Sequence, residues 1–91
     1  MQCKKCLVDG RVQGVYYRAT AARRAAELNL RGYARNLPDG RVELLACGEA
    51  DAVDTFVKWL WVGSSASKVT SVEVREAATG DTDTPHGFFT A

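Results

Sequence analysis

The order in which strand-forming and helix-forming segments alternate is the feature that most constrains the fold of this chain. Residues 19–29 are rich in Ala, Arg, Glu and Leu, which are good helix formers. Residues 49–62 repeat apolar side chains at three- and four-residue spacing, which is typical of an amphipathic helix. Strands are expected before, between and after these helices, at residues 3–9, 31–37, 41–47, 68–76 and 88–90.

A tight turn joins the two central strands. Pro38, Asp39 and Gly40 follow one another, and this composition is typical of a turn because proline presets one dihedral and glycine accepts a positive φ. Two strand–helix units joined by a hairpin predict the ferredoxin-like split β-α-β sandwich, an α+β fold. We expect a four- to five-stranded antiparallel sheet with two helices on one face, in a single domain over residues 1–91.

Apolar periodicity predicts which side chains form the core. Alternation along the first strand places Cys6 and Val8 on one face and Cys3 on the other. The other core candidates follow helical or alternating spacing: Ala21, Ala25, Leu28, Val53, Phe56, Val57, Leu60, Val72 and Val74.

Composition excludes several classes of protein. Hydrophobic residues make up 46% and charged residues 25% of the 91 residues, which is typical of globular domains and not of disordered, collagen-like or low-complexity chains. No apolar run approaches the ~18 residues of a membrane span. The first residues also lack the apolar stretch of a signal peptide. We therefore expect a cytoplasmic protein with no membrane partner.

Charge is unevenly spread along the chain. The net charge is +1, but residues 1–41 carry +6 and residues 42–91 carry −5. This asymmetry favours an anion site built from the first part of the chain. The alternative is that the two parts interleave in the fold and neutralise each other.

The three cysteines are expected to be reduced. An odd number does not suit the disulfide framework of a secreted protein. Cys3, Cys6, Cys47 and His86 would formally complete a zinc set. Cys3 and Cys6 nevertheless point to opposite faces of a strand, so we expect no metal site. His86 is expected to be an exposed loop residue.

The segment from Gly10 to Arg18, with the sequence G-R-V-Q-G-V-Y-Y-R, is the richest in functional signals. Two glycines four residues apart indicate a structured loop between a strand and a helix. Such a loop can turn its N–H groups toward one point and bind an anion, aided by the positive helix N-terminus. Arg18 offers a bidentate fork for phosphate or carboxylate. The alternative is a glycine-rich turn beside a solvated arginine.

Asn36 is the second candidate residue, at the end of the second predicted strand. Its amide both donates and accepts hydrogen bonds, so it can orient a water molecule without carrying charge. The alternative is an asparagine that simply begins the turn.

Two segments of this chain resemble the signatures of the acylphosphatase family. The loop from Gly10 to Arg18 resembles the first signature, and residues 28–43, L-N-L-R-G-Y-A-R-N-L-P-D-G-R-V-E, resemble the second. The resemblance extends over essentially the whole chain through further matching positions, at Gly48, Phe56, Trp59, Leu60, Gly63, Val69, Val72 and Phe88 or Phe89. It implies the same ferredoxin-like fold. It also implies a hydrolase that cleaves the carboxyl–phosphate anhydride of acyl phosphates to a carboxylate and inorganic phosphate, with no metal and no cofactor.

The resemblance also implies roles for individual residues. Arg18 would bind the phosphate and Asn36 would orient the attacking water. The partners implied are a small-molecule acyl phosphate and inorganic phosphate, the latter as product and competitive ligand. Apart from the resemblance, a single compact domain with a short terminal strand favours a monomer. The phosphate would be bound by the loop residues Arg11, Val12, Gln13, Gly14, Val15, Tyr16, Tyr17 and Arg18.

Several positions depart from the family pattern. Tyr17 stands where phenylalanine is usual and adds a hydroxyl that needs a partner. Asn29 replaces a glycine but can still adopt the left-handed conformation that ends a helix. Ala34 replaces a common valine, and Ser64 begins a Ser-Ser pair where Gly-Pro-Pro is frequent.

Two other functions remain open from the sequence. One is a non-catalytic module that binds phosphate or a carbamoyl-phosphate-like anion. The other is a nucleic-acid module, which would need aromatic and basic residues on the uncovered sheet face. Tyr33 is a lone aromatic candidate there, and the net charge is small, so we expect no nucleic-acid partner.

Overall fold

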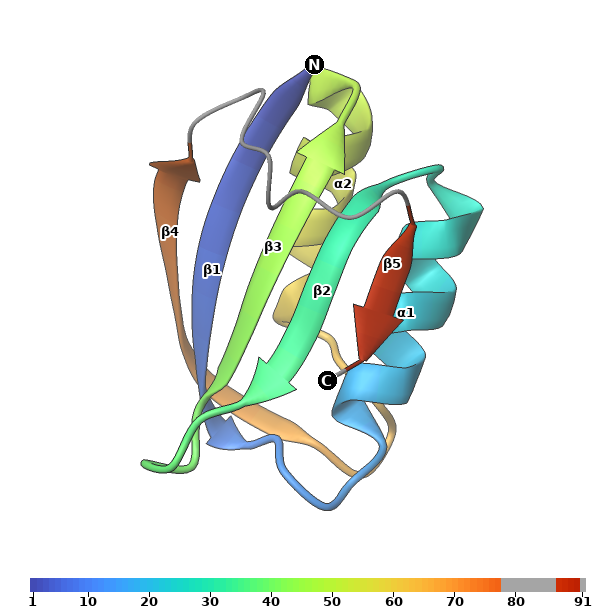
Figure 1. Ribbon diagram of the computed structural model, residues 1–91. Coiled ribbons are helices and arrows are strands. Elements are labelled where there is room, and N and C mark those ends of the chain that lie inside the picture. The colour runs from blue at the N-terminus through green and yellow to red at the C-terminus, as the bar shows by residue number, and fades with distance from the viewer. Residues whose placement is uncertain (78–86, 91) are drawn as a thin grey trace.

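The computed structural model describes residues 1–77 and 87–90 of the chain, and its elements follow the expected order (Figure 1). The helices start and end within two residues of the expected bounds, and β1 and β4 are slightly longer than expected. The elements are β1 (Gln2–Arg11), α1 (Tyr17–Glu27), β2 (Arg31–Asn36), β3 (Val42–Gly48), α2 (Ala50–Leu60), β4 (Lys68–Ala77) and β5 (Phe88–Thr90).

The five strands form one sheet in the order β4-β1-β3-β2-β5. β1 pairs with both β3 and β4, and β2 with β3, all antiparallel. β5 pairs with β2 in the parallel direction. The sheet is therefore mixed, and the expectation of a purely antiparallel sheet is wrong for this one strand. β4 runs opposite to β2, so β5, which runs opposite to β4, lies parallel to β2 at the other edge of the sheet.

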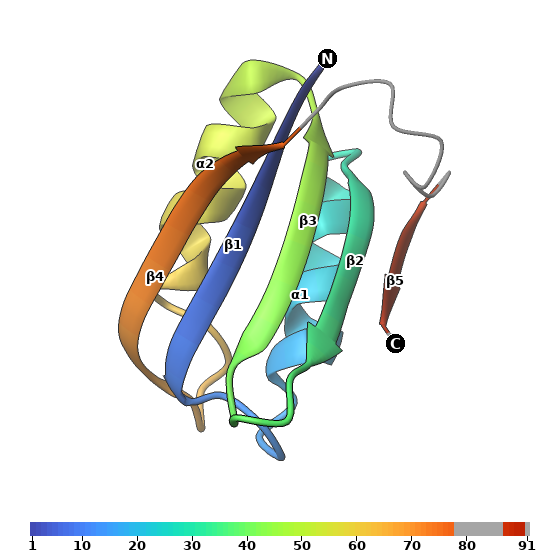
Figure 2. The ribbon, with the colours of Figure 1, turned by 60° about the vertical axis from the view of Figure 1, so that its left-hand side comes forward.

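Both helices cover the same face of the sheet, as Figures 1 and 2 show from two sides. The expected helical stripes form the core: Ala21 and Ala25 of α1 have no exposed surface. The same is true of Val53, Phe56 and Leu60 of α2. From the sheet, the fully buried members of this core are Cys6, Val8, Ala34, Val42, Leu44 and Ala46.

The outer strand β4 is less covered than its sequence suggests. Val74 was expected in the core, but 41% of its surface is exposed, and Val72 is only partly buried. β4 forms the edge of the sheet and has a strand neighbour on one side only. Alternation predicts the face that a side chain occupies, but the position of the strand in the sheet decides how deeply that face is buried.

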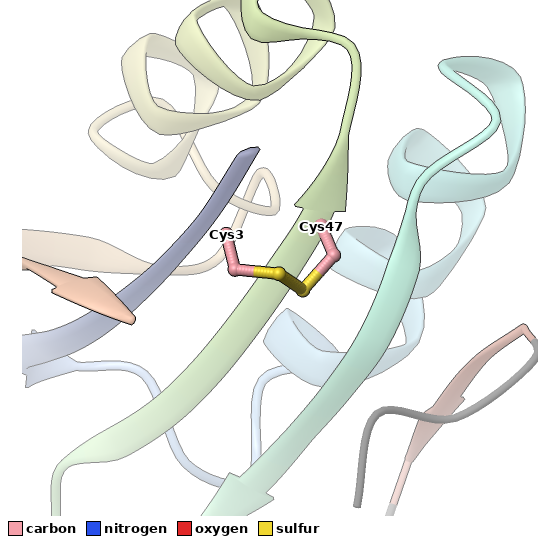
Figure 3. The surroundings of a disulfide bond; sticks show 2 residues. All are labelled: Cys3 and Cys47. Atoms are coloured by element: carbon pink, nitrogen blue, oxygen red, sulfur yellow. A yellow bond between two sulfur atoms is a disulfide. The ribbon is translucent and has the colours of Figure 1, made fainter. Parts of the chain in front are cut away.

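Cys3 and Cys47 form a disulfide that joins β1 to β3 (Figure 3). They are direct partners in the strand register. The expectation that all three cysteines are reduced is therefore wrong for these two, because Cys47 follows Cys3 by 44 residues and only the strand pairing brings them together. Cys6 is free and buried on the other face, as the alternation predicts.

The described residues contain neither a group suited to a metal ion nor a helix that could span a membrane. Within residues 1–77 and 87–90, no group of three or more metal-binding side chains lies close enough to hold an ion. His86 and most of the expected loop 77–87 lie outside the described residues. No helix in the described ranges is long and apolar enough to cross a membrane.

The basic and acidic parts of the chain partly neutralise each other. Lys4 of β1 pairs with Asp54 of α2 at 3.2 Å, and Arg35 of β2 pairs with Glu43 of β3 at 2.8 Å. Both pairs join the first 41 residues to the rest. The interleaved arrangement therefore holds for part of the surface.

Candidate active site

Three connections meet at one end of the sheet, at the bottom of Figure 1. They are the loop between β1 and α1, the turn between β2 and β3, and the connection from α2 to β4. The first of these holds most of the expected site residues. We call residues 12–16 the site loop.

A backbone irregularity sends the chain from β1 into the site loop. The pairing of β1 with β4 shifts register between Asp9 and Gly10, which is a β-bulge. Gly10 has φ of +122°, and a Cβ there would collide with the carbonyl oxygen of Lys68. Only glycine suits this position, because it accepts the positive φ and leaves room for the neighbouring backbone.

The site loop is bound to the β2–β3 turn by one side chain. The Nε2 group of Gln13 donates to the carbonyl oxygens of Leu37 and Arg41, each at 2.9 Å. Leu37 directly follows Asn36 in the chain, and Arg41 lies at the far end of the same turn. Gln13 therefore connects the loop directly to the segment that follows the second candidate residue.

The same turn is stabilised by its own charged residues. The Arg41 backbone N–H donates to the Asp39 carboxylate at 3.1 Å, and the Arg41 guanidinium Nε donates to it at 2.7 Å. These interactions lower the pKa of Asp39, with the backbone hydrogen bond as the main cause. The acceptor turn for Gln13 is thus held in a defined shape.

A second contact holds the site loop to the connection after α2. The Ser64 hydroxyl donates to the carbonyl oxygen of Val15 at 2.6 Å. Next to it, the Tyr17 hydroxyl donates to the Leu60 carbonyl oxygen at 2.8 Å. The extra hydroxyl of Tyr17 therefore has the partner that it needs, and burial raises the pKa of Tyr17 far above its usual value.

The N-terminus of α1 is open toward the site loop. No side chain caps this end, and its first turn holds no acidic residue. Within the described ranges, no backbone carbonyl accepts a hydrogen bond from the N–H groups of residues 13–16. Unpaired N–H groups and a positive helix end are the elements from which proteins build anion sites.

A pocket of about 330 Å³ lies beside this helix start. Arg18, in the first turn of α1, and Gly14 both contribute to its wall. Gly14 has φ of +74°, and a Cβ there would meet nothing within 4 Å. The remaining lining residues are Val12, Tyr16, Tyr17 and Ala19. Among the described residues, the pocket wall therefore combines the Arg18 guanidinium with loop backbone whose N–H groups donate to no backbone carbonyl, a combination suited to an oxyanion.

Asn36 is exposed at the end of β2 and does not line this pocket. Ala34, two residues earlier, is buried on the helix-covered face, so strand alternation places Asn36 on the same side of the sheet as α1. The hydrogen bonds from Gln13 join the site loop to Leu37 and Arg41, in the segment that follows Asn36.

Comparison with known proteins identifies the family of this chain. The family model for acylphosphatase matches residues 4–89. The acylphosphatase of Chromohalobacter salexigens is 53% identical over 88 residues, which cover 97% of this chain and 93% of that protein. This chain belongs to the acylphosphatase family. The resemblance seen in the two signatures is thereby confirmed.

Further acylphosphatases agree in sequence and in fold. The protein of Methylococcus capsulatus is 58% identical over 76 residues, covering 82% of this chain and 83% of that one. The crystal structure of acylphosphatase from Bacillus subtilis matches with a TM-score of 0.93 at 38% identity, covering 100% of this chain and 99% of that one. The ferredoxin-like arrangement expected from the order of elements is therefore confirmed.

The structure separates the expected phosphate-binding residues of this acylphosphatase chain into two groups. Val12, Gly14, Tyr16, Tyr17 and Arg18 line the pocket. The others do not: Arg11 ends β1, Gln13 directs its side chain to the β2–β3 turn, and Val15 is buried with its carbonyl bound by Ser64.

Sequence reasoning missed two supporting side chains. The sequence indicates Gln13 only as one of the phosphate-binding loop residues and Ser64 only as a departure from the family pattern. Their acceptors lie 24 or more residues away along the chain, so no local spacing could have indicated them.

Proposed function

We propose that this chain hydrolyses the carboxyl–phosphate anhydride of acyl phosphates without a metal ion, with Arg18 binding the phosphate and Asn36 orienting the attacking water. Family membership makes the chain a hydrolase that acts on acid anhydrides. The observation that supports the finer proposal most is the start of α1, where Arg18 lines a pocket beside loop N–H groups that donate to no backbone carbonyl of the described residues.

The phosphate end of the substrate matches the charge of this pocket. A phosphoryl group carries about two negative charges, and its transfer is catalysed by positioning and by stabilising charge on its oxygens. The Arg18 guanidinium supplies a bidentate donor. The backbone N–H groups of the site loop supply further donors that need no reorganisation during the reaction.

Asn36 suits a positioning role because its amide carries no charge. It holds a water molecule in line with the breaking P–O bond, which converts the attack into an oriented, nearly unimolecular step. The leaving carboxylate has a low pKa, near 4 for an ordinary carboxyl. A strong general acid is therefore unnecessary, and a phosphate oxygen accepts the proton of the water.

Hydrolysis of benzoyl phosphate, followed by ultraviolet absorbance with a chelator present, tests this proposal. We expect wild type to hydrolyse benzoyl phosphate. Arg18→Ala should reduce kcat/KM at least about 10²-fold, and inorganic phosphate should no longer inhibit this variant. Asn36→Ala should lose kcat by a similar factor and keep that inhibition. Arg23→Ala, an exposed arginine on the same helix, is the matched control and should retain activity.

Three results would contradict these roles. If Asn36→Ala lost phosphate inhibition while Arg18→Ala kept it, the two roles would be reversed. If the chelator abolished wild-type turnover, the reaction would depend on a metal. If folded wild type bound phosphate without turnover, the chain would be a binding module for phosphate-like anions.

We also propose that the enzyme works as a monomer with the site loop of a single chain. The described residues that line the pocket all fall within 12–19 of one chain, which favours a site built from a single copy. Light scattering at assay concentration should give the mass of one chain, about 9.9 kDa. A dimer with full activity would contradict the monomer but leave the site unchanged.

A further inference from the structure

Tyr16 has an unusual backbone conformation for its residue type. It precedes α1 with φ of 62° and ψ of 19°, in the left-handed region. A bulky side chain rarely adopts this conformation, and such outliers gather at functional sites. The Tyr16 carbonyl oxygen accepts hydrogen bonds from the Thr20 N–H at 3.0 Å and the Thr20 hydroxyl at 2.8 Å.

The consequence of this conformation is that the Tyr16 side chain is exposed between two buried neighbours. Val15 is 7% exposed and Tyr17 is 1% exposed, whereas Tyr16 is 82% exposed. The surrounding contacts therefore hold a large aromatic ring in solvent. Packing does not explain this placement, because most of the Tyr16 surface stays exposed.

This exposed ring belongs to the wall of the pocket that contains Arg18. Among the described residues that line the pocket, Val12 and Tyr17 are buried, Gly14 has no side chain and Ala19 offers one methyl group. Tyr16 is thus the large exposed apolar surface beside the proposed phosphate position.

We propose that Tyr16 contacts the acyl group of the substrate and favours aromatic over small acyl groups. The inference rests on the proposed function, in which the site loop and Arg18 bind the phosphate end. The acyl end of the bound substrate then extends past the rim of the pocket, where Tyr16 lies. An aromatic acyl group buries apolar area against the Tyr16 ring and stacks on it, whereas an acetyl group offers little surface for either.

The test compares benzoyl phosphate with acetyl phosphate in wild type, Tyr16→Phe, Tyr16→Ala and Tyr16→Gly. The readout is the ratio of the two kcat/KM values, because the intrinsic reactivities of the substrates cancel between variants. We expect Tyr16→Ala and Tyr16→Gly to lower this ratio about 3- to 10-fold, mainly through KM for benzoyl phosphate. Tyr16→Phe should keep the wild-type ratio.

The two small variants separate the ring from the backbone. Glycine adopts the left-handed conformation freely and alanine does not. If Tyr16→Ala lowered the ratio of kcat/KM values while Tyr16→Gly kept the wild-type ratio, loop geometry would be responsible and the inference would be overturned. An unchanged ratio in both would also overturn it, although turnover would continue. Absence of turnover in folded wild type would instead overturn the proposed function, and this inference with it.

Discussion

Cys6 shows how burial alone sets the chemistry of one residue. Its side chain has no exposed surface and lies in the core between the sheet and the helices. Burial raises the pKa of Cys6 from about 9 to about 11, with the nearby Lys4 acting in the opposite direction. The thiol is therefore neutral over the physiological range and behaves as a small apolar side chain.

Stability should fall as the pH rises through the alkaline range. Above pH 9 the unfolded chain loses the Cys6 proton while the folded chain keeps it, so the folded state loses about 1 kcal/mol by pH 10. Tyr17, whose pKa burial also raises, adds to the loss above pH 10. Denaturant titrations from pH 8 to 10 measure this slope.

Cys6→Ala is the matched variant for that experiment. It should be less stable than wild type at pH 8, because a small cavity replaces the thiol. Its stability should change less between pH 8 and pH 10. An identical slope in both proteins would show that Cys6 does not contribute to it.

Among the elements, the site loop depends on its neighbours more than on its own sequence. Gln13 binds it to the β2–β3 turn, and Ser64 binds it to the segment after α2. The loop therefore reaches its shape only when both of these segments are in place. Such support matters because small displacements of catalytic groups cost large factors in rate.

Gln13→Ala should reduce both activity and stability. Leu37 and Arg41 keep other donors for their carbonyl oxygens, so the stability loss should be only about 1–2 kcal/mol. We expect kcat/KM for benzoyl phosphate to fall about 10-fold or more, because the loop is no longer fixed beside Asn36.

Thr55→Ala serves as the control for Gln13→Ala. It also removes a side-chain hydrogen bond to a backbone carbonyl, from the Thr55 hydroxyl to Asp51 in α2, but away from the site loop. Its kcat/KM should match wild type. If Gln13→Ala also kept full activity, Gln13 would support the fold and not the site.

In the whole molecule, the disulfide and the site lie at opposite ends of the sheet (Figures 1 and 3). Gly10 is the seventh residue after Cys3 along β1, which corresponds to roughly 23 Å of strand. The bond closes a long segment, because its cysteines are 44 residues apart. Disulfides persist in oxidising surroundings and are rare in the cytosol, and the cytoplasmic location of this chain stays a prediction.

The double variant Cys3→Ala/Cys47→Ala should separate stability from activity. Losing the constraint on the unfolded chain should lower the free energy of unfolding by about 2–4 kcal/mol. Because the site is at the other end of the sheet, kcat/KM at 25 °C should change less than about 2-fold. As a control, unfolded wild type should show one reactive thiol without reductant and three thiols after reduction. Three reactive thiols without reductant would contradict the disulfide.

Local patterns were sufficient for much of the fold and for recognising the family, whereas the roles of Arg18 and Asn36 stay predictions. The order of strands and helices, the face of Cys6 and the stripes on both helices follow from spacing and propensity, which involve residues a few positions apart. The loop from Gly10 to Arg18 was recognisable for the same reason. Its glycines and its arginine form one continuous segment.

The remaining features required the tertiary structure because they join distant residues. Cys47 as the partner of Cys3, the parallel direction of β5 and the exposure of Val74 all depend on the strand order. The acceptors of Gln13 depend on how the site loop meets the β2–β3 turn. By itself the sequence determined which elements form and where the glycine-containing loop between β1 and α1 lies, since those depend on local propensity. Only the packed sheet decided which side chains support that loop and which cysteines pair, since those depend on contacts between segments far apart in the chain.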